Sequence, residues 1–278
     1  MKKILVPIDF SLHSEYALKV AAIIAKQMNS EIIVLHMLGL SEAILTKDEA
    51  QEAAEAIYYI KLAEKRFTTF LDKDYLTGIR VTKAVQNYKI FSEINEVAKE
   101  KKADLIVMGS HGSSGLSEVF VGSNTEKVVR TAEVPVLVIK KPMKEFRIKE
   151  VVFACDFKIE NLKPYHKALQ LLELFNPNIH LLYVNLPAEN FRSSDQIEET
   201  IKEFLFRADA GNLDRYNDVI IQNDYSVESG IFSYSKKINA DMIIIPTHGR
   251  KGLSHFFNGS IGEDIINHTN IPVITLKI

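Results

Sequence analysis

Residues 104–125 read DLIVMGSHGSSGLSEVFVGSNT, an aliphatic run followed by a long loop rich in glycine and serine. A strand buried on both faces of a parallel sheet is apolar along its length, and residues 104–109 fit that description. The glycines then follow the pattern G-x2-G-x9-G-S from Gly109 to Ser123, and a stretch of helical period comes next. The segment therefore predicts a strand, a glycine-rich loop and a helix, which together form one unit of an α/β fold.

Similar units fill the rest of the first half of the chain. Aliphatic runs predict four further strands, at residues 3–7, 31–36, 78–85 and 134–140. Between the first two, apolar residues from Ala17 to Met28 recur at helical spacing, and Ser11 is placed to cap the start of that helix. Strands that alternate with helices in this way predict a parallel sheet covered on both faces.

The second half of the chain repeats the pattern of the first. Asp9 and Phe10 recur 147 residues later as Asp156 and Phe157. Beyond the second strand the offset is 137 residues, and it relates Asp104, Gly112, Gly122, Ser123 and Pro135 to Asp241, Gly249, Gly259, Ser260 and Pro272. A constant register on each side of one gap indicates a duplication. We therefore predict two domains, residues 1–143 and 147–278.

The link between these two domains is short. We expect them to pack on each other as a pseudo-dimer through the final strands, residues 134–140 and 272–278, whose edges would otherwise be open. A homodimer of the whole chain is an alternative that the sequence leaves open.

Composition and charge narrow the class of partner. The 278 residues carry 34 basic and 36 acidic side chains, a formal net charge of −2, so we do not expect a nucleic-acid partner. No run reaches the roughly 18 apolar residues that a membrane-spanning helix needs, and the short apolar run after Met1 does not resemble a signal peptide. The lone Cys155 is interpreted as a core residue and not as a redox thiol. We expect a cytoplasmic protein.

The glycine-rich loop is the place where a ligand is expected. Glycine lets backbone N–H groups approach a phosphate closely, and the helix that follows offers further N–H donors. Asp9 ends the first strand, so it shares a crevice with Gly109 if the first and fourth strands are neighbours. Asp9 would then contact the ligand, although an acid at this position also suits the start of a helix. We interpret His111 and His248 as loop or ligand contacts, because no nucleophile or carboxylate partner is evident beside them.

Three segments carry a resemblance to a known family. Residues 7–10 (PIDF), residues 34–37 (VLHM) and the two parts of the glycine loop resemble the ATP-binding branch of the universal stress protein family. The resemblance implies two doubly wound, five-stranded parallel sheets of order 3-2-1-4-5, with ATP, ADP or AMP and Mg²⁺ bound in the first domain. It assigns to the base and ribose Pro7, Ile8, Asp9 and Met37. It assigns to the ribose and phosphates Met108, Gly109, His111, Gly112, Gly122, Ser123, Asn124 and Thr125.

The second copy departs from this pattern at two positions. Pro246 replaces Gly109, and proline has no N–H to donate and a ring that crowds the backbone. Gly262 replaces Thr125. We therefore expect a degenerate second site and one nucleotide per chain. A weaker anion site would retain Asp156, Gly249, Gly259 and Ser260.

The first functional hypothesis is a nucleotide-dependent switch in a stress response, as the family resemblance implies. No P-loop and no evident carboxylate pair for metals is present, so we expect no metal-ligating side chains and at most slow ATP hydrolysis or autophosphorylation. The second hypothesis is a nucleotide-free dimerising scaffold. The third is an adenylyl-transferring or pyrophosphatase enzyme, which residues 8–11 do not favour because they lack the loop motifs of those enzymes.

Overall fold

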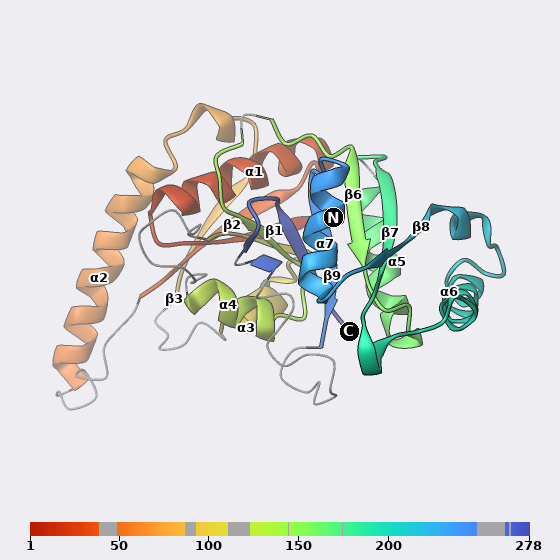
Figure 1. The fold of residues 1–278 in the computed structure, drawn as a ribbon. Coiled ribbons are helices and arrows are strands. Elements are labelled where there is room, and N and C mark those ends of the chain that lie inside the picture. The colour runs from red at the N-terminus through yellow and green to blue at the C-terminus, as the bar shows by residue number, and fades with distance from the viewer. Residues whose placement is uncertain are drawn as a thin grey trace. The chain divides into compact units, whose positions relative to one another are not determined.

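The computed structural model describes residues 1–38, 49–86, 93–110, 123–143, 145–173, 175–248, 265–266 and 268–278, without the side chains of residues 49–56 and 123–124. The described residues divide between Phe146 and Arg147 into two compact units (Figure 1). Each unit is a parallel sheet with helices packed against it. Among these residues, no helix combines the length and the apolar character needed to cross a membrane.

The first unit contains five strands in the order β3-β2-β1-β4-β5, and each neighbouring pair is parallel. This is the order 3-2-1-4-5 that the resemblance implies. Its strands are β1 (Lys3–Ile8), β2 (Glu31–Met37), β3 (Val81–Gln86), β4 (Leu105–Gly109) and β5 (Val136–Ile139). Its helices are α1 (Leu12–Met28), α2 (Glu49–Phe70), the 3-10 turn η2 (Asp74–Leu76), α3 (Glu93–Lys101) and α4 (Ser123–Thr131).

The second unit repeats this order as β8-β7-β6-β9-β10, again with parallel neighbours. Its strands are β6 (Glu150–Ala154), β7 (Asn178–Asn185), β8 (Val219–Asn223), β9 (Met242–Thr247) and β10 (Val273–Lys277). Its helices are α5 (Leu162–Leu172), α6 (Ser194–Ala208) and α7 (Val227–Lys237), with short 3-10 turns η3 (Ile159–Asn161), η4 (Ala188–Asn190) and η5 (Asp214–Asp218). Helix α6 has 15 residues where α2 has 22, so the shorter second copy has lost part of this peripheral helix.

The core of each unit lies along its central strand. Ile4, Leu5 and Val6 of β1 are completely buried, as expected for a strand covered on both faces. Helix α1 begins after Ser11, whose side chain accepts a hydrogen bond from the backbone N–H of Ser14. The predicted helix cap is therefore confirmed.

The turn after each central strand places a phenylalanine in the left-handed backbone region. Phe10 has a φ of 66° and Phe157 a φ of 53°, which disfavours a residue with a Cβ by about 1–2 kcal/mol. Ring packing offsets this cost: the ring of Phe10 lies 4.5 Å from that of His36, and the ring of Phe157 lies 5.4 Å from that of Phe204. Phe157 is buried and Phe10 is half-buried, and the Asp9 that precedes Phe10 is exposed.

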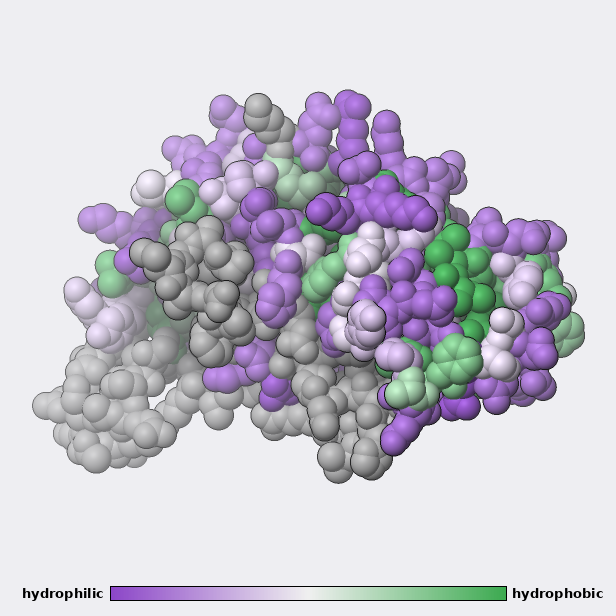
Figure 2. Space-filling view, in the orientation of Figure 1, coloured by the Kyte–Doolittle hydropathy of each residue, from purple (hydrophilic) through white to green (hydrophobic). Residues whose placement is uncertain are grey.

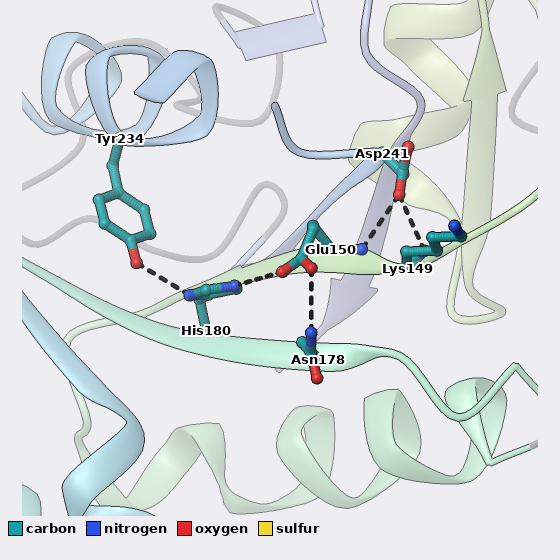
Figure 3. Close-up of polar contacts among 6 residues, drawn as sticks. All are labelled: Lys149, Glu150, Asn178, His180, Tyr234 and Asp241. Atoms are coloured by element: carbon teal, nitrogen blue, oxygen red, sulfur yellow. Dashed lines mark hydrogen bonds and ion pairs between the residues drawn. The ribbon is translucent and has the colours of Figure 1, made fainter. Parts of the chain in front are cut away.

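The same hydrogen-bond pattern occurs at the amino end of each sheet, where one aspartate oxygen accepts from two successive backbone N–H groups. Asp104 Oδ2 accepts from the backbone N–H groups of Lys2 and Lys3 at 2.6 and 3.0 Å. Asp241 Oδ2 accepts in the same way from Lys149 and Glu150, at 2.8 and 3.0 Å (Figure 3). The same contact at residues 137 apart supports the duplication that the sequence indicates.

A polar cluster unique to the second unit ties β6, β7 and α7 together at this end of the sheet. One ring nitrogen of His180, Nε2, lies 2.7 Å from Glu150 Oε2, and Nδ1 lies 2.8 Å from the Tyr234 hydroxyl (Figure 3). Asn178 Nδ2 donates to Glu150 Oε1 at 2.9 Å. Hydrogen bonds from His180 and Asn178 hold the pKa of Glu150 below its ordinary value.

Strand β8 is at the outer edge of the second sheet. Within the described part of the chain none of its five residues is buried, and Ile221 is 46% exposed. Figure 2 shows hydrophobic residues gathered over this strand. This edge therefore presents an apolar surface.

Candidate functional site

The strand order brings the ends of β1 and β4 side by side, where the sequence predicts a crevice. Strand β1 pairs with β2 on one side and with β4 on the other, with Ile8 opposite His36 and Leu5 opposite Ile106. Continuing that register places Asp9 beside Ser110, at the carboxyl ends of neighbouring parallel strands. Ligands of doubly wound folds bind at such a switch point.

Asp9 lies exposed at this crevice and is held by the start of α1. Its Oδ1 accepts hydrogen bonds from the backbone N–H of Ser11, at 2.9 Å, and from the Ser14 hydroxyl. The Ser14 hydroxyl in turn accepts from the backbone N–H of Asp9 at 3.0 Å. Burial alone would raise the pKa of Asp9, but the hydrogen bonds from Ser11 and Ser14 together lower it. Asp9 is thus a fixed, ionised acceptor as well as part of the helix start.

The other residues assigned to the nucleoside form the floor of the crevice. The side chains of Pro7, Ile8 and Met108 are buried, and that of Met37 is half-buried. Of these four residues, Met37 is therefore the one whose side chain a ligand reaches most readily.

His36 is a residue at the crevice that the sequence reasoning did not single out. Its Nδ1 lies 2.9 Å from the carbonyl oxygen of Ile8, and its ring packs against Phe10. Arg66 extends from α2, and its guanidinium lies 5.5 Å from the centre of the Phe10 ring. The signal that could have indicated His36 was the repeated aspartate–phenylalanine pair, because the phenylalanine ring of this turn packs against a ring on the next strand.

Gly109 has a packing role that the sequence could not show. A Cβ at this position would lie 2.1 Å from the carbonyl oxygen of His13, so the first turn of α1 packs directly on the end of β4. Thr125 is buried, and its hydroxyl donates to the carbonyl oxygen of Gly109 at 3.2 Å. The first turn of α4 is thereby fastened to the end of β4.

The remaining predicted residues are placed only in part. Ser123 and Asn124 lie in the first turn of α4, whose backbone N–H groups have no partner within the helix. Outside the described residues lie His111, Gly112, Gly122, Gly249, Gly259 and Ser260.

The crevice of the second unit differs chemically at the aspartate. Asp156 Oδ1 accepts from Asn161 Nδ2 at 2.7 Å, and Asp156 Oδ2 pairs with Lys158 Nζ at 2.6 Å. Lys158 stands where the first unit has Ser11. Asp156 therefore has a cation partner in its own loop.

Pro246 is buried at the end of β9, in place of Gly109. The helix after the central strand also begins differently in the two units. In the second unit the 3-10 turn η3 precedes α5, whereas α1 follows its strand without such a turn. A proline ring needs more space than a glycine. The altered helix start is consistent with that need.

A cavity of about 390 Å³ nevertheless lies in this second crevice. Asp156, Lys158, Tyr183, Pro246 and the thiol-bearing Cys155 are among the residues that line it. Burial raises the pKa of the Cys155 thiol, so the thiol is protonated and reacts slowly at neutral pH.

The fold defines a tandem protein of two doubly wound α/β units, each with a switch point in its strand order. A profile of the universal stress protein family matches residues 1–140 and again residues 147–277. The chain therefore belongs to the universal stress protein family, and it carries two copies of the family's domain.

Individual relatives agree with this assignment. Universal stress protein MJ0531 of Methanocaldococcus jannaschii is 36% identical over 157 residues, which cover 52% of this chain and 85% of that protein. Universal stress protein Slr1230 of Synechocystis is 22% identical over 304 residues and matches 100% of both chains. The crystal structure of a universal stress protein from Archaeoglobus fulgidus is similar with a TM-score of 0.62, at 21% identity over 99% of this chain and 98% of that one. The last likeness shows the tandem fold.

Proposed function

We propose that the first unit binds ATP at the crevice between β1 and β4, and that its occupancy switches the conformation or partner choice of the tandem protein. The observation that carries this proposal is Asp9. Its carboxylate is exposed and ionised at the switch point, and hydrogen bonds from Ser11 and Ser14 fix its orientation. A fixed carboxylate is a suitable acceptor for a pair of sugar hydroxyls.

The surrounding residues fit a nucleotide. Pro7 and Ile8 form an apolar floor beside Asp9, and the N-terminus of α4 offers backbone N–H groups where phosphates would lie. The Thr125 hydroxyl donates to Gly109 and keeps its oxygen as an acceptor. Mg²⁺ would accompany the phosphates and be bound mainly by their oxygens and by water.

One nucleotide per chain is the expected stoichiometry. Lys158 neutralises Asp156 in the second unit, so that carboxylate is a weaker acceptor for sugar hydroxyls than Asp9. Pro246 removes a backbone donor from the end of β9. Both differences act against a second nucleotide.

Thermal unfolding with and without Mg²⁺-ATP tests this proposal. A ligand at about 100 times its dissociation constant stabilises the folded state by roughly 2.7 kcal/mol, which raises the unfolding midpoint by a few degrees. Asp9→Asn should abolish the rise in midpoint, whereas the matched variant Asp156→Asn in the second unit should retain it. An equal rise in both variants would contradict the assignment of ATP to the first unit.

The second candidate function is a nucleotide-free scaffold, and one observation favours it. The close approach of His13 to Gly109 gives that glycine a packing role that needs no ligand. In this case millimolar ATP would leave the midpoint of the folded protein unchanged, and the chain would form a concentration-dependent homodimer in sedimentation experiments. Three further predictions belong to the first proposal. They are packing of the two units as a pseudo-dimer, a cytoplasmic location, and slow ATP hydrolysis or autophosphorylation.

A further inference from the structure

The cavity of the second unit has an aliphatic body. Its walls include Leu182 and Val184 of β7, Val227 and Ile231 of α7, and Ile245 of β9. Its volume of about 390 Å³ lies within the range of roughly 300–1,000 Å³ that is usual for small-molecule sites. Such walls favour a small apolar group.

One end of the cavity is polar and carries the charged side chains of Asp156, Lys158 and Arg192. Arg192 and Lys158 lower the pKa of the Tyr183 hydroxyl and Asp156 raises it, although burial has the largest effect and raises it overall. Two cations and one carboxylate thus act on this hydroxyl. Lys158 Nζ and Asp156 Oδ2 pair at 2.6 Å, so Arg192 is the remaining cation of the lining. Glu199 of α6 also lines the cavity.

Arg192 is held in place through its backbone. The side chain of Asn185, which is buried at the end of β7, accepts from the backbone N–H of Arg192 at 3.1 Å and donates to its carbonyl oxygen at 3.3 Å. Asn185 also donates to Asn223 Oδ1 at 3.1 Å. Among the described residues, no carboxylate pairs with the guanidinium of Arg192, which is left to bind a ligand.

The first unit lacks these residues. At the offset of 147 residues, Leu38 stands in place of Asn185, His36 in place of Tyr183 and Ser11 in place of Lys158. The second crevice has therefore not simply lost features of the first. At these three positions it carries a lysine, a tyrosine hydroxyl and the asparagine that holds the backbone of Arg192.

We propose that this cavity binds a small organic carboxylate with an aliphatic body. The carboxylate group would lie on the Arg192 guanidinium and the Tyr183 hydroxyl, where it accepts charge-assisted hydrogen bonds. The aliphatic body would occupy the space between β7, β9 and α7. This site is separate from the nucleotide crevice proposed for the first unit.

Decanoate serves as the probe, and Cys155 reports where it binds. Cys155 is the single cysteine of the chain and lines the cavity. Because the thiolate is the reactive form, alkylation of the full-length protein by N-ethylmaleimide is followed at about pH 8.5, where decanoate should slow it in a saturable manner. Isothermal titration calorimetry then gives the dissociation constant, and 1-decanol, which has the same chain length without the charge, should bind at least tenfold more weakly.

Two variants and one control locate the carboxylate group. Arg192→Gln should weaken decanoate binding about tenfold or more, because it removes the ionic partner. The control variant is Arg207→Gln. The guanidinium of Arg207 pairs with Glu203 on α6, so its loss should leave decanoate binding unchanged. Val227→Trp fills the cavity and should abolish both binding and protection of Cys155, while the unchanged far-UV circular dichroism shows that the variant is folded.

Several results would overturn the proposal. These are no protection of Cys155 at millimolar decanoate, equal affinity for decanoate and 1-decanol, or an Arg192→Gln variant that binds as well as wild type. Protection of Cys155 by ATP would assign a nucleotide to this cavity instead. Asp9→Asn, which tests the nucleotide proposal, should not affect decanoate binding, so the two proposals fail separately.

Discussion

Replacing Ser11 by lysine should give the first unit the ion pair that distinguishes the second. In the second unit Lys158 Nζ lies 2.6 Å from Asp156 Oδ2, two residues along the chain, and Ser11 stands two residues after Asp9. The backbone N–H that Ser11 donates to Asp9 is present in any residue other than proline. The lysine of Ser11→Lys can therefore reach the Asp9 carboxylate without disturbing this turn.

The effects on stability and on binding differ in size. Loss of the Ser11 helix cap costs about 1 kcal/mol, and an exposed ion pair returns only about 0–1 kcal/mol. Hydrogen bonds to a charged group contribute about 1.5–3 kcal/mol, so a neutralised Asp9 should weaken ATP binding roughly tenfold or more. The variant should remain folded while its affinity for nucleotide falls.

Isothermal titration calorimetry with Mg²⁺-ATP measures this loss against a matched control. Ser11→Ala removes the same helix cap without adding a charge, so the ratio of the two dissociation constants isolates the lysine. If Ser11→Lys bound ATP as tightly as Ser11→Ala, then Asp9 would not be the acceptor for the nucleotide, and the reasoning would be refuted.

Three further predictions concern stability. Gly109→Ala should destabilise the protein by roughly 1–3 kcal/mol in urea titrations, because its Cβ would lie 2.1 Å from the carbonyl oxygen of His13; an unchanged midpoint would contradict this close packing. The lowered pKa of Glu150 implies stability that is present above its ordinary value of 4.5 and lost as pH falls through the lower folded value. The difference in unfolding free energy between wild type and Glu150→Gln should therefore be larger at pH 6 than at pH 3. An equal difference at both pH values would show that the link to His180 does not depend on charge. Ser193→Ala removes a capping box at the start of α6 and should cost about 1 kcal/mol, measured as a lower urea midpoint, whereas an unchanged value would mean that this helix end contributes no stability.

The fold was predictable because the strands are short, rich in aliphatic residues and repeated. The run at residues 104–109 corresponds to β4, and the constant offsets of the repeat correspond to two sheets of identical order. Strand ends were less well determined. The run expected at residues 78–85 forms a strand only from Val81, because the turn at Gly78, with a φ of 81°, is not extended.

The crevice was predictable in position but not in its contacts. Asp9 could be placed at the switch point because strand order follows from topology. The approach of His13 to Gly109 depends on how the helix packs on the sheet, which no local pattern encodes. The polar end of the second cavity depends likewise on Arg192, whose backbone is hydrogen-bonded to the side chain of Asn185. Pro246 indicated a lost site, whereas the structure shows a cavity of different chemistry.

The number of ATP molecules bound per chain tests the central claim most directly. Titration calorimetry of the full-length protein with Mg²⁺-ATP should give one site, and that site should disappear in Asp9→Asn and persist in Asp156→Asn. Binding that persists in Asp9→Asn, or two sites of similar affinity, would contradict the proposal that the first unit alone holds the nucleotide.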